Sequence, residues 1–332
     1  MTKVAVQAAS EKAQRLIKIF REIGETPIPT YGVEGGVRSI QEILESLATP
    51  GNASDPEVIE RSIAGAGIHD LAAKITTVWD GYPTERAMLA PHLRLLARTY
   101  HVAQNTDHER WDRIDGEPRE HGAADKVIEL YFACLCLLAH MSVELDDPFT
   151  SSKGANPDVI ATAADGTRWA FALKTQSRGN PRNRAINLAD LLNGAAKQIL
   201  RARCDKGVAV VNLKNVIDHA RLRASGAYAR WEDARDALES QVDAILEEFH
   251  QTHVATLNPA FTQKGVLAPV VFLIAHTTVL CLAPGATQPA FTEIKSMKAR
   301  MLPQRRIPEP GTYAAEVTAL ARVFNDLVQR QI

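Results

Sequence analysis

The sequence has few cysteines and no long apolar segment, and each shortage excludes a class of protein. The four cysteines among 332 residues form no Cys-x-x-Cys pair, so neither a zinc site nor a disulfide framework is indicated. The longest apolar run, residues 266–282, is too short and too polar to span a membrane. The first residues lack the apolar core of a signal peptide. We therefore expect a cytoplasmic protein with no membrane association.

The sequence also lacks an overall charge and the common nucleotide-binding loops. Its formal net charge is −1, so any site for a polyanion must come from local clustering of basic residues. Neither GxxxxGK[ST] nor GxGxxG occurs, which argues against nucleotide binding by those loops. His276 lies inside the long apolar run, and we expect it to be a hydrogen-bonded histidine of the core.

The first 120 residues are predicted to form a helical accessory region. Helical spacing of apolar residues covers about 10–22, 58–79 and 83–98, with a Ser54–Glu57 capping box ahead of the second segment. None of these segments carries a chemical motif, so the region is interpreted as accessory or dimerising. The polar stretch 105–120 is predicted to be a linker to the rest of the chain.

Residues 156–176 are predicted to form a β-hairpin. Asp165-Gly166 is a strong turn pair between two short apolar segments. In the second strand the large apolar side chains share one face, which we expect to pack on the core: Trp169, Phe171 and Leu173. Lys174 and Gln176 lie on the opposite face near the strand end, and Asp158 on the first strand is within reach of them.

This hairpin resembles that of the PD-(D/E)XK, or restriction-endonuclease-like, nuclease superfamily. Pro157-Asp158 corresponds to its "PD" and Ala172-Leu173-Lys174 to its "(D/E)XK", with Ala172 in the position of the second acid. The resemblance covers about residues 124–282. It implies an α/β fold with a restriction-endonuclease-like core, in which a central mixed sheet is flanked by helices. We place this core at 121–285, after the all-helical region 1–120 and before a basic loop and C-terminal helix at 286–332.

The elements expected around the hairpin agree with that order. A helix over 123–140 is apolar nearly all round and should be buried. A helix from Asn187 to about Cys204 leads to an apolar strand, 208–211, and such a crossover predicts a parallel pair with the hairpin. Later we expect a helix over 231–249, a buried strand or hairpin over 266–282, a loop over 294–308 and a helix over 312–331.

The resemblance implies a magnesium site, with Mn²⁺ as a substitute. Asp158 would be the central ligand, Glu129 on the preceding helix a second, and the backbone carbonyl of Leu173 a third. Lys174 would orient the attacking water or neutralise the phosphate, and Gln176 and Gln198 would be neutral hydrogen-bonding neighbours. The alternatives stay open: Asp158 as a turn residue, Lys174 as a solvated strand end and Glu129 as an exposed acid near a helix start. Glu144, Asp146 and Asp147 are expected in a solvated loop, from which one could serve as a migrated ligand.

Basic residues cluster after the hairpin. Between Lys174 and Lys206 there are eight basic residues and two acidic ones. Five of the eight are expected to contact nucleic acid: Arg178, Arg182, Arg184, Lys197 and Arg201. A second cluster consists of Lys295, Lys298, Arg300, Arg305 and Arg306, for which a solvated charged face is an equal alternative.

The function predicted from the sequence is metal-dependent hydrolysis of DNA phosphodiester bonds, as in restriction or defence nucleases. Three explanations of Ala172 remain open: another acid compensates for it, the site is inactive, or the alanine was introduced to disarm a nuclease. A catalytically dead nuclease fold that binds nucleic acid or a protein is the alternative function, and a helical scaffold is a third. A homodimer is compatible with cutting both strands of a duplex.

Overall fold

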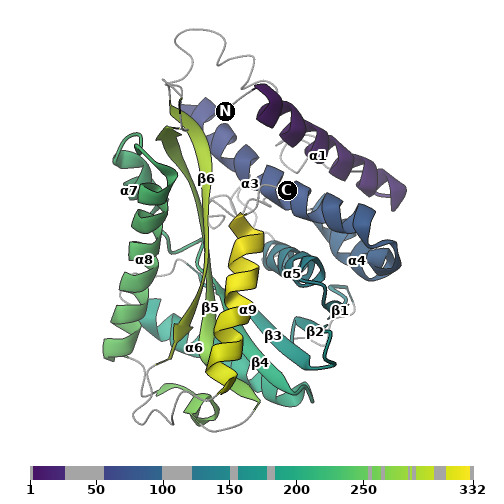
Figure 1. The fold of residues 1–332 in the computed structure, drawn as a ribbon, viewed down its shortest axis with the longest axis vertical. Helices are drawn as coiled ribbons and strands as arrows, with labels where there is room; N and C mark the ends of the chain where they lie inside the picture. The colour runs from purple at the N-terminus through teal and green to yellow at the C-terminus, as the bar shows by residue number, and fades with distance from the viewer. Residues whose placement is uncertain are drawn as a thin grey trace, which may run out of the picture.

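The protein is an α/β structure whose single open sheet has six strands and is flanked by helices (Figure 1). The computed structural model describes residues 3–26, 56–98, 122–149, 156–177, 184–252, 256–262, 266–282, 285, 289–302 and 312–329. None of the helices in these ranges is long and apolar enough to cross a membrane. The Ser54 capping box and the linker predicted at 105–120 lie outside them.

The strands follow one another across the sheet in the order of the chain. They are β1 (Ser142–Leu145), β2 (Val159–Thr162), β3 (Arg168–Thr175), β4 (Lys206–Asn212), β5 (Leu267–Leu282) and β6 (Pro289–Met301). The first three strands form an antiparallel meander, β3, β4 and β5 are parallel, and β6 is antiparallel to β5. The sheet is therefore mixed, as predicted.

Helices cover both faces of the sheet, and each face has its own hydrophobic core. One face packs against α3 (Pro56–Gly81), α4 (Arg86–Ala97), α5 (Gly122–Leu138) and α9 (Thr312–Gln329), and α1 (Lys3–Glu22) packs on α3 and α4 as an outer helix of the same core. The other packs against α6 (Arg184–Arg201), α7 (His219–Ala224) and α8 (Trp231–Thr252). The described residues also include two short 3₁₀ turns, η2 (Pro83–Glu85) and η6 (Pro259–Thr262).

The hairpin β2–β3 forms as the sequence predicts. Gly166 has φ +86°, and the side chain of Asp165 accepts a hydrogen bond from the backbone N–H of Thr167 at 2.9 Å. Trp169, Phe171 and Leu173 all enter the core under α5. Ala170 and Ala172 face the other core, under α6. The period-two pattern therefore assigned both faces of β3 correctly.

Helix α6 makes the crossover between the parallel strands β3 and β4, which was also predicted. The helix approaches the start of β4 very closely at Gly207. A Cβ atom on Gly207 would lie 2.1 Å from the Cγ2 atom of Ile199, so only glycine allows this packing. Helix α6 begins at Arg184 rather than at Asn187, so the predicted start of the helix was three residues late.

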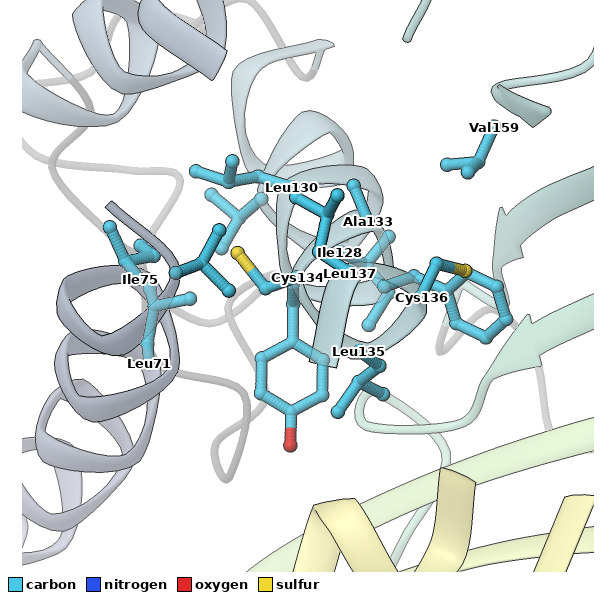
Figure 2. Packing of buried hydrophobic residues seen from close by; sticks show 14 of the residues in the cluster. Leu71, Ile75, Ile128, Leu130, Ala133, Cys134, Leu135, Cys136, Leu137 and Val159 are labelled. Carbon is cyan, nitrogen blue, oxygen red and sulfur yellow. The ribbon is translucent and has the colours of Figure 1, made fainter. Parts of the chain in front are cut away.

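Helix α5 is buried on almost every side (Figure 2). Leu71 and Ile75 of α3 lie on one side of it, and Val159 of β2 lies on the other. Its apolar sequence predicted this central position. Helix α5 therefore joins the N-terminal helices to the sheet.

Two strands were not predicted. Strand β1 is four residues long and includes Glu144, which we had expected in a solvated loop. Strand β6 occupies much of the segment 294–308 that we expected to be a basic loop. The antiparallel ladder to β5 holds β6 extended, and ion pairs neutralise its basic residues; Lys295 contacts Asp70 and Arg300 contacts Asp243, each at 2.5 Å.

Candidate functional site

The structure brings Asp158 and Lys174 together at the edge of the β2–β3 hairpin. The Nζ atom of Lys174 lies 3.4 Å from Oδ2 of Asp158, and the same oxygen accepts a hydrogen bond from the backbone N–H of Leu173 at 2.7 Å. The Asp158 side chain is largely buried, while that of Lys174 remains partly exposed. Asp158 is thus anchored by β3 immediately before β2 begins.

The strand register places Ala172 directly beside Asp158. Val159 pairs with Phe171, so one step towards the N-terminus Asp158 lies opposite Ala172. Ala172 is completely buried in the apolar core under α6. No carboxylate is therefore available at this position of β3, and a glutamate introduced there would enter an apolar environment.

On the other side of Asp158 the register places a different acid. Leu145 of β1 pairs with Val159, so Asp146 follows opposite Asp158, and its backbone N–H lies 3.5 Å from the Asp158 carbonyl oxygen. Asp146 is half-buried. Glu144 instead points to solvent and pairs with Arg168 at 2.9 Å. Among the loop acids considered from the sequence, Asp146 is the one whose backbone meets Asp158.

Glu129 is buried in α5 and is not the exposed acid of the alternative interpretation. The Nζ atom of Lys126 lies 2.7 and 2.8 Å from its two carboxylate oxygens. His92 of α4 contributes its Nε2 atom at 3.4 Å. Neither neighbour was predicted from the sequence. Lys126 was detectable, because residues three apart meet on a helix, but His92 lies 37 residues from Glu129 and carries no such signal.

The two carboxyl groups influence each other. Burial raises the pKa of Asp158 to about 6; the ammonium group of Lys174 opposes this rise, and the negative charge of Glu129 adds to it. Glu129 is therefore close enough to Asp158 for its charge to be felt. Asp158 and Glu129 are thus two buried acids, each paired with a partly exposed lysine, Lys174 and Lys126 respectively.

The donor set suits a hard divalent cation. Carboxylate oxygens are the ligands that Mg²⁺ prefers, and the charge of the Glu129 carboxylate acts on that of Asp158. The N–H and C=O groups of one strand residue point to the same side, so the hydrogen bond from Leu173 to Asp158 also directs the Leu173 carbonyl towards this edge. Asp158 and the Leu173 carbonyl therefore lie at the same edge of β3, whereas Glu129 belongs to α5, which packs on the face of the sheet that carries Trp169 and Phe171.

The two predicted glutamines are buried near this edge. Gln198 of α6 donates from Nε2 to the backbone carbonyl of Asn156 at 3.1 Å, two residues before Asp158. Its Oε1 atom is buried and has no hydrogen-bond partner within the described part of the chain. Gln176 continues β3, and its backbone N–H donates to the carbonyl of Asn212 at 2.9 Å. Gln198 thus helps to fix the loop that enters β2.

The predicted nucleic-acid residues are only partly described. Lys197 and Arg201 are exposed on α6, on the side away from the core. Arg184 opens α6, and Arg178 and Arg182 lie outside the described residues. In the second cluster Lys295, Lys298 and Arg300 each pair with an acid, namely Asp70, Glu239 and Asp243. Ion pairs therefore neutralise that part of the second cluster, and Lys295 is buried rather than solvated.

A second polar cluster lies inside the protein, between α3, α5, β5 and β6. The carboxylate of Asp70 accepts hydrogen bonds from Lys295 at 2.5 Å, from Lys74 at 3.2 Å and from the Tyr131 hydroxyl at 3.0 Å. His276 lies beside it, with Nδ1 3.7 Å from Oε1 of Glu293. His276 is buried as predicted, but neither of its ring nitrogens has a hydrogen-bond partner within the described residues, so the prediction of a hydrogen-bonded histidine was wrong.

Burial and mutual charge control the titration of this cluster. Burial raises the pKa of Glu293 to about 8, and the charge of Asp70 adds to the rise. Burial lowers the pKa of His276 to about 3. Burial alone would raise the pKa of Asp70, but the ammonium groups of Lys295 and Lys74 outweigh it and hold this pKa below its usual value.

Asp70, His276 and Glu293 offer ligand atoms within 4.8 Å of one another, and no other trio in the described ranges does so. Yet the Lys74 and Lys295 side chains, 0% and 6% exposed, already supply two positive charges to this trio. A divalent ion would have to coexist with two ammonium groups that cannot reach solvent. We therefore interpret the cluster as a buried ion network that joins α3 to the sheet, and not as a metal centre.

No protein-family model matches the chain, and searches of curated proteins and of solved structures also give no match.

Proposed function

We propose that the protein cleaves phosphodiester bonds of DNA with a divalent metal ion held at Asp158 and Glu129. The observation that carries the proposal is the Asp158–Lys174 pair, 3.4 Å apart where β2 begins and β3 ends. An acid and a lysine delivered by adjoining strands to one edge are what the resemblance to the PD-(D/E)XK nucleases leads us to expect.

The topology around the pair supports a restriction-endonuclease-like core. The chain runs from helix α5 through the antiparallel strands β1, β2 and β3, and then through α6 to the parallel strand β4. This is the helix, hairpin, helix and strand order that the resemblance implies. The N-terminal helices would act as an accessory layer that fixes α5 and, with it, Glu129.

Each residue has a chemical role in this proposal. Asp158, Glu129 and the Leu173 carbonyl hold the metal ion, which supplies charge stabilisation and an acidic bound water. Lys174 neutralises the phosphate and orients the attacking water, because its flexible stem carries a compact charge to the exposed side of the pocket. Lys197 and Arg201 contact neighbouring phosphates of the DNA, which makes binding sensitive to salt.

Asp146 is the residue that we propose in place of the acid missing at Ala172. It flanks Asp158 on the side of β1, while Ala172 flanks Asp158 on the side of β3. A carboxylate there can approach the same edge of the sheet from the opposite neighbouring strand. The alternative function is a catalytically dead DNA-binding module, which the complete burial of Ala172 in an apolar core favours.

The test is cleavage of supercoiled plasmid DNA with Mg²⁺ or Mn²⁺. Asp158→Asn should abolish cleavage, and Asp146→Asn should reduce it strongly, whereas Asp236→Asn on the exposed surface of α8 is the matched control and should leave it unchanged. If the wild type never cuts while Ala172→Glu does, the missing acid is the whole defect. The binding module is favoured if neither chain cuts and both bind DNA equally well with and without metal.

A further inference from the structure

Lys126 holds a position that a metal ion would need. Its ammonium group bridges both oxygens of Glu129, at 2.7 and 2.8 Å, in the way that a cation bound to a carboxylate would. The same ammonium group also lowers the pKa of Asp158, so its charge reaches both acids of the site. While this arrangement persists, Glu129 is fully neutralised.

Unlike the lysines of the buried network, Lys126 has a route away from its partner. Its side chain is 21% exposed, equal to that of Lys174, whereas the Lys74 side chain has no exposed surface. A lysine stem has four rotatable bonds and its ammonium group is strongly hydrated, so Lys126 can leave Glu129 for solvent once another cation neutralises that buried carboxylate. The lysines of the ion network around Asp70 have no comparable path to solvent.

The charges of the site explain what such a movement would achieve. With both acids ionised, Asp158 and Glu129 balance Lys126 and Lys174, and the site is neutral. A divalent cation on the two acids would leave two uncompensated ammonium groups at the mouth of the pocket. A phosphodiester brings one negative charge and its pentavalent transition state about two, so the released lysines match the charge that develops.

We propose that Lys126 is a stand-in cation: it occupies Glu129 in the metal-free protein and passes to a phosphate of the substrate when a divalent metal binds. This inference rests on the proposed function, because it takes Asp158 and Glu129 as the metal ligands. It identifies the substrate as an anion that binds together with the metal. The metal releases Lys126 to contact the phosphate, and the phosphate neutralises the positive charge that the metal adds to the site. Metal and DNA should therefore bind cooperatively, and the coupling should depend on Lys126.

The experiment measures binding of Mn²⁺ by the electron paramagnetic resonance signal of the free ion, without any turnover. Lys126→Gln removes the competing ammonium group and should bind Mn²⁺ about tenfold more tightly than the wild type, a typical size for coupling between sites. Lys126→Arg keeps the bridge to Glu129 and should bind no more tightly than the wild type. Lys18→Gln removes one exposed positive charge on α1, which has no part in the proposed site, and is the matched control; it should leave Mn²⁺ binding unchanged.

The DNA arm uses fluorescence anisotropy of a short labelled duplex with and without Mn²⁺. In the wild type Mn²⁺ should tighten DNA binding, and in Lys126→Gln this gain should disappear. Equal Mn²⁺ affinity in the wild type and Lys126→Gln, with binding still lost in Asp158→Asn, would overturn the role of Lys126 and leave the proposed metal site standing. If neither the wild type nor Lys126→Gln binds Mn²⁺ in an Asp158-dependent manner, the metal site itself is wrong and the inference fails with it.

Discussion

Asp70→Asn should destabilise the protein strongly, because Asp70 is the acceptor on which the buried ion network depends. The substitution keeps the shape of the side chain but removes its charge. It removes the carboxylate that neutralises the ammonium groups of Lys295 and Lys74, which lie 2.5 and 3.2 Å from Oδ1 of Asp70 in the wild type. Breaking a buried pair from one side generally costs about 3–5 kcal/mol.

The charged groups that remain around residue 70 set limits on the loss in the free energy of unfolding. Deprotonating one lysine of ordinary pKa at pH 7 costs about 4–5 kcal/mol, which sets an upper limit per uncompensated ammonium group. Glu293 reduces the loss, because the charge of Asp70 helps to keep it protonated, and once Asp70 is neutral it can ionise and take over as counter-ion. We therefore expect Asp70→Asn to lower the free energy of unfolding by about 3 kcal/mol. The double variant with Glu293→Gln should lose more than the sum of the two single losses.

Urea denaturation followed by circular dichroism measures these differences. The matched control is Asp80→Asn, which breaks the surface pair with Arg15, whose side chains are 50% and 29% exposed. That loss should be at most about 1 kcal/mol, since solvent screens exposed pairs. Equal losses for Asp70→Asn and Asp80→Asn would refute the interpretation of the cluster as an ion network that anchors α3.

Three further predictions concern pH, packing and the support of Glu129. Because burial raises the pKa of Glu293 to about 8, the unfolded chain releases its proton at lower pH than the folded one, and stability should fall as pH rises. His276, with its pKa lowered to about 3, produces the opposite trend only below about pH 6.5. The fall in the free energy of unfolding should therefore be clear between about pH 6.5 and 8, at up to about 1.4 kcal/mol per pH unit. It should be absent in Glu293→Gln. Gly207→Ala should lower the free energy of unfolding by about 1–3 kcal/mol in denaturant titrations, because its new methyl group meets Ile199. The smaller side chain of Ile199→Ala should relieve part of that loss in the double variant. Losses that simply add would contradict this packing. His92→Ala should weaken Asp158-dependent Mn²⁺ binding severalfold by freeing Glu129 to reorient, whereas an unchanged isotherm would show that His92 does not position that acid.

The hairpin and the helices were predictable because local patterns determine them. The turn at Asp165-Gly166, the alternation of Trp169 and Phe171, and the continuous apolar surface of α5 each report a local backbone preference or a buried face. Strand β6 was missed because its extended form depends on pairing with β5 and on ion pairs to distant helices, as for Lys295 with Asp70. Strand β1 is too short to show a period.

The candidate site was predictable only where its residues lie close in sequence. Asp158 and Lys174 belong to one hairpin, so their meeting followed from strand geometry. Lys126 and Glu129 share a helix, and the pairing was available from their spacing. His92 and the buried cluster around Asp70 are assembled from elements far apart in the chain, and no local pattern shows which partners the fold brings to them.

The most direct test of the metal site is a crystal structure of the wild-type protein soaked in Mn²⁺ and recorded at the manganese absorption edge. We predict an anomalous peak between the carboxylates of Asp158 and Glu129, within coordination distance of the Leu173 carbonyl, with the Lys126 side chain turned away from Glu129. Density that shows Lys126 still bridging Glu129 and manganese elsewhere, for example at His276, would contradict it.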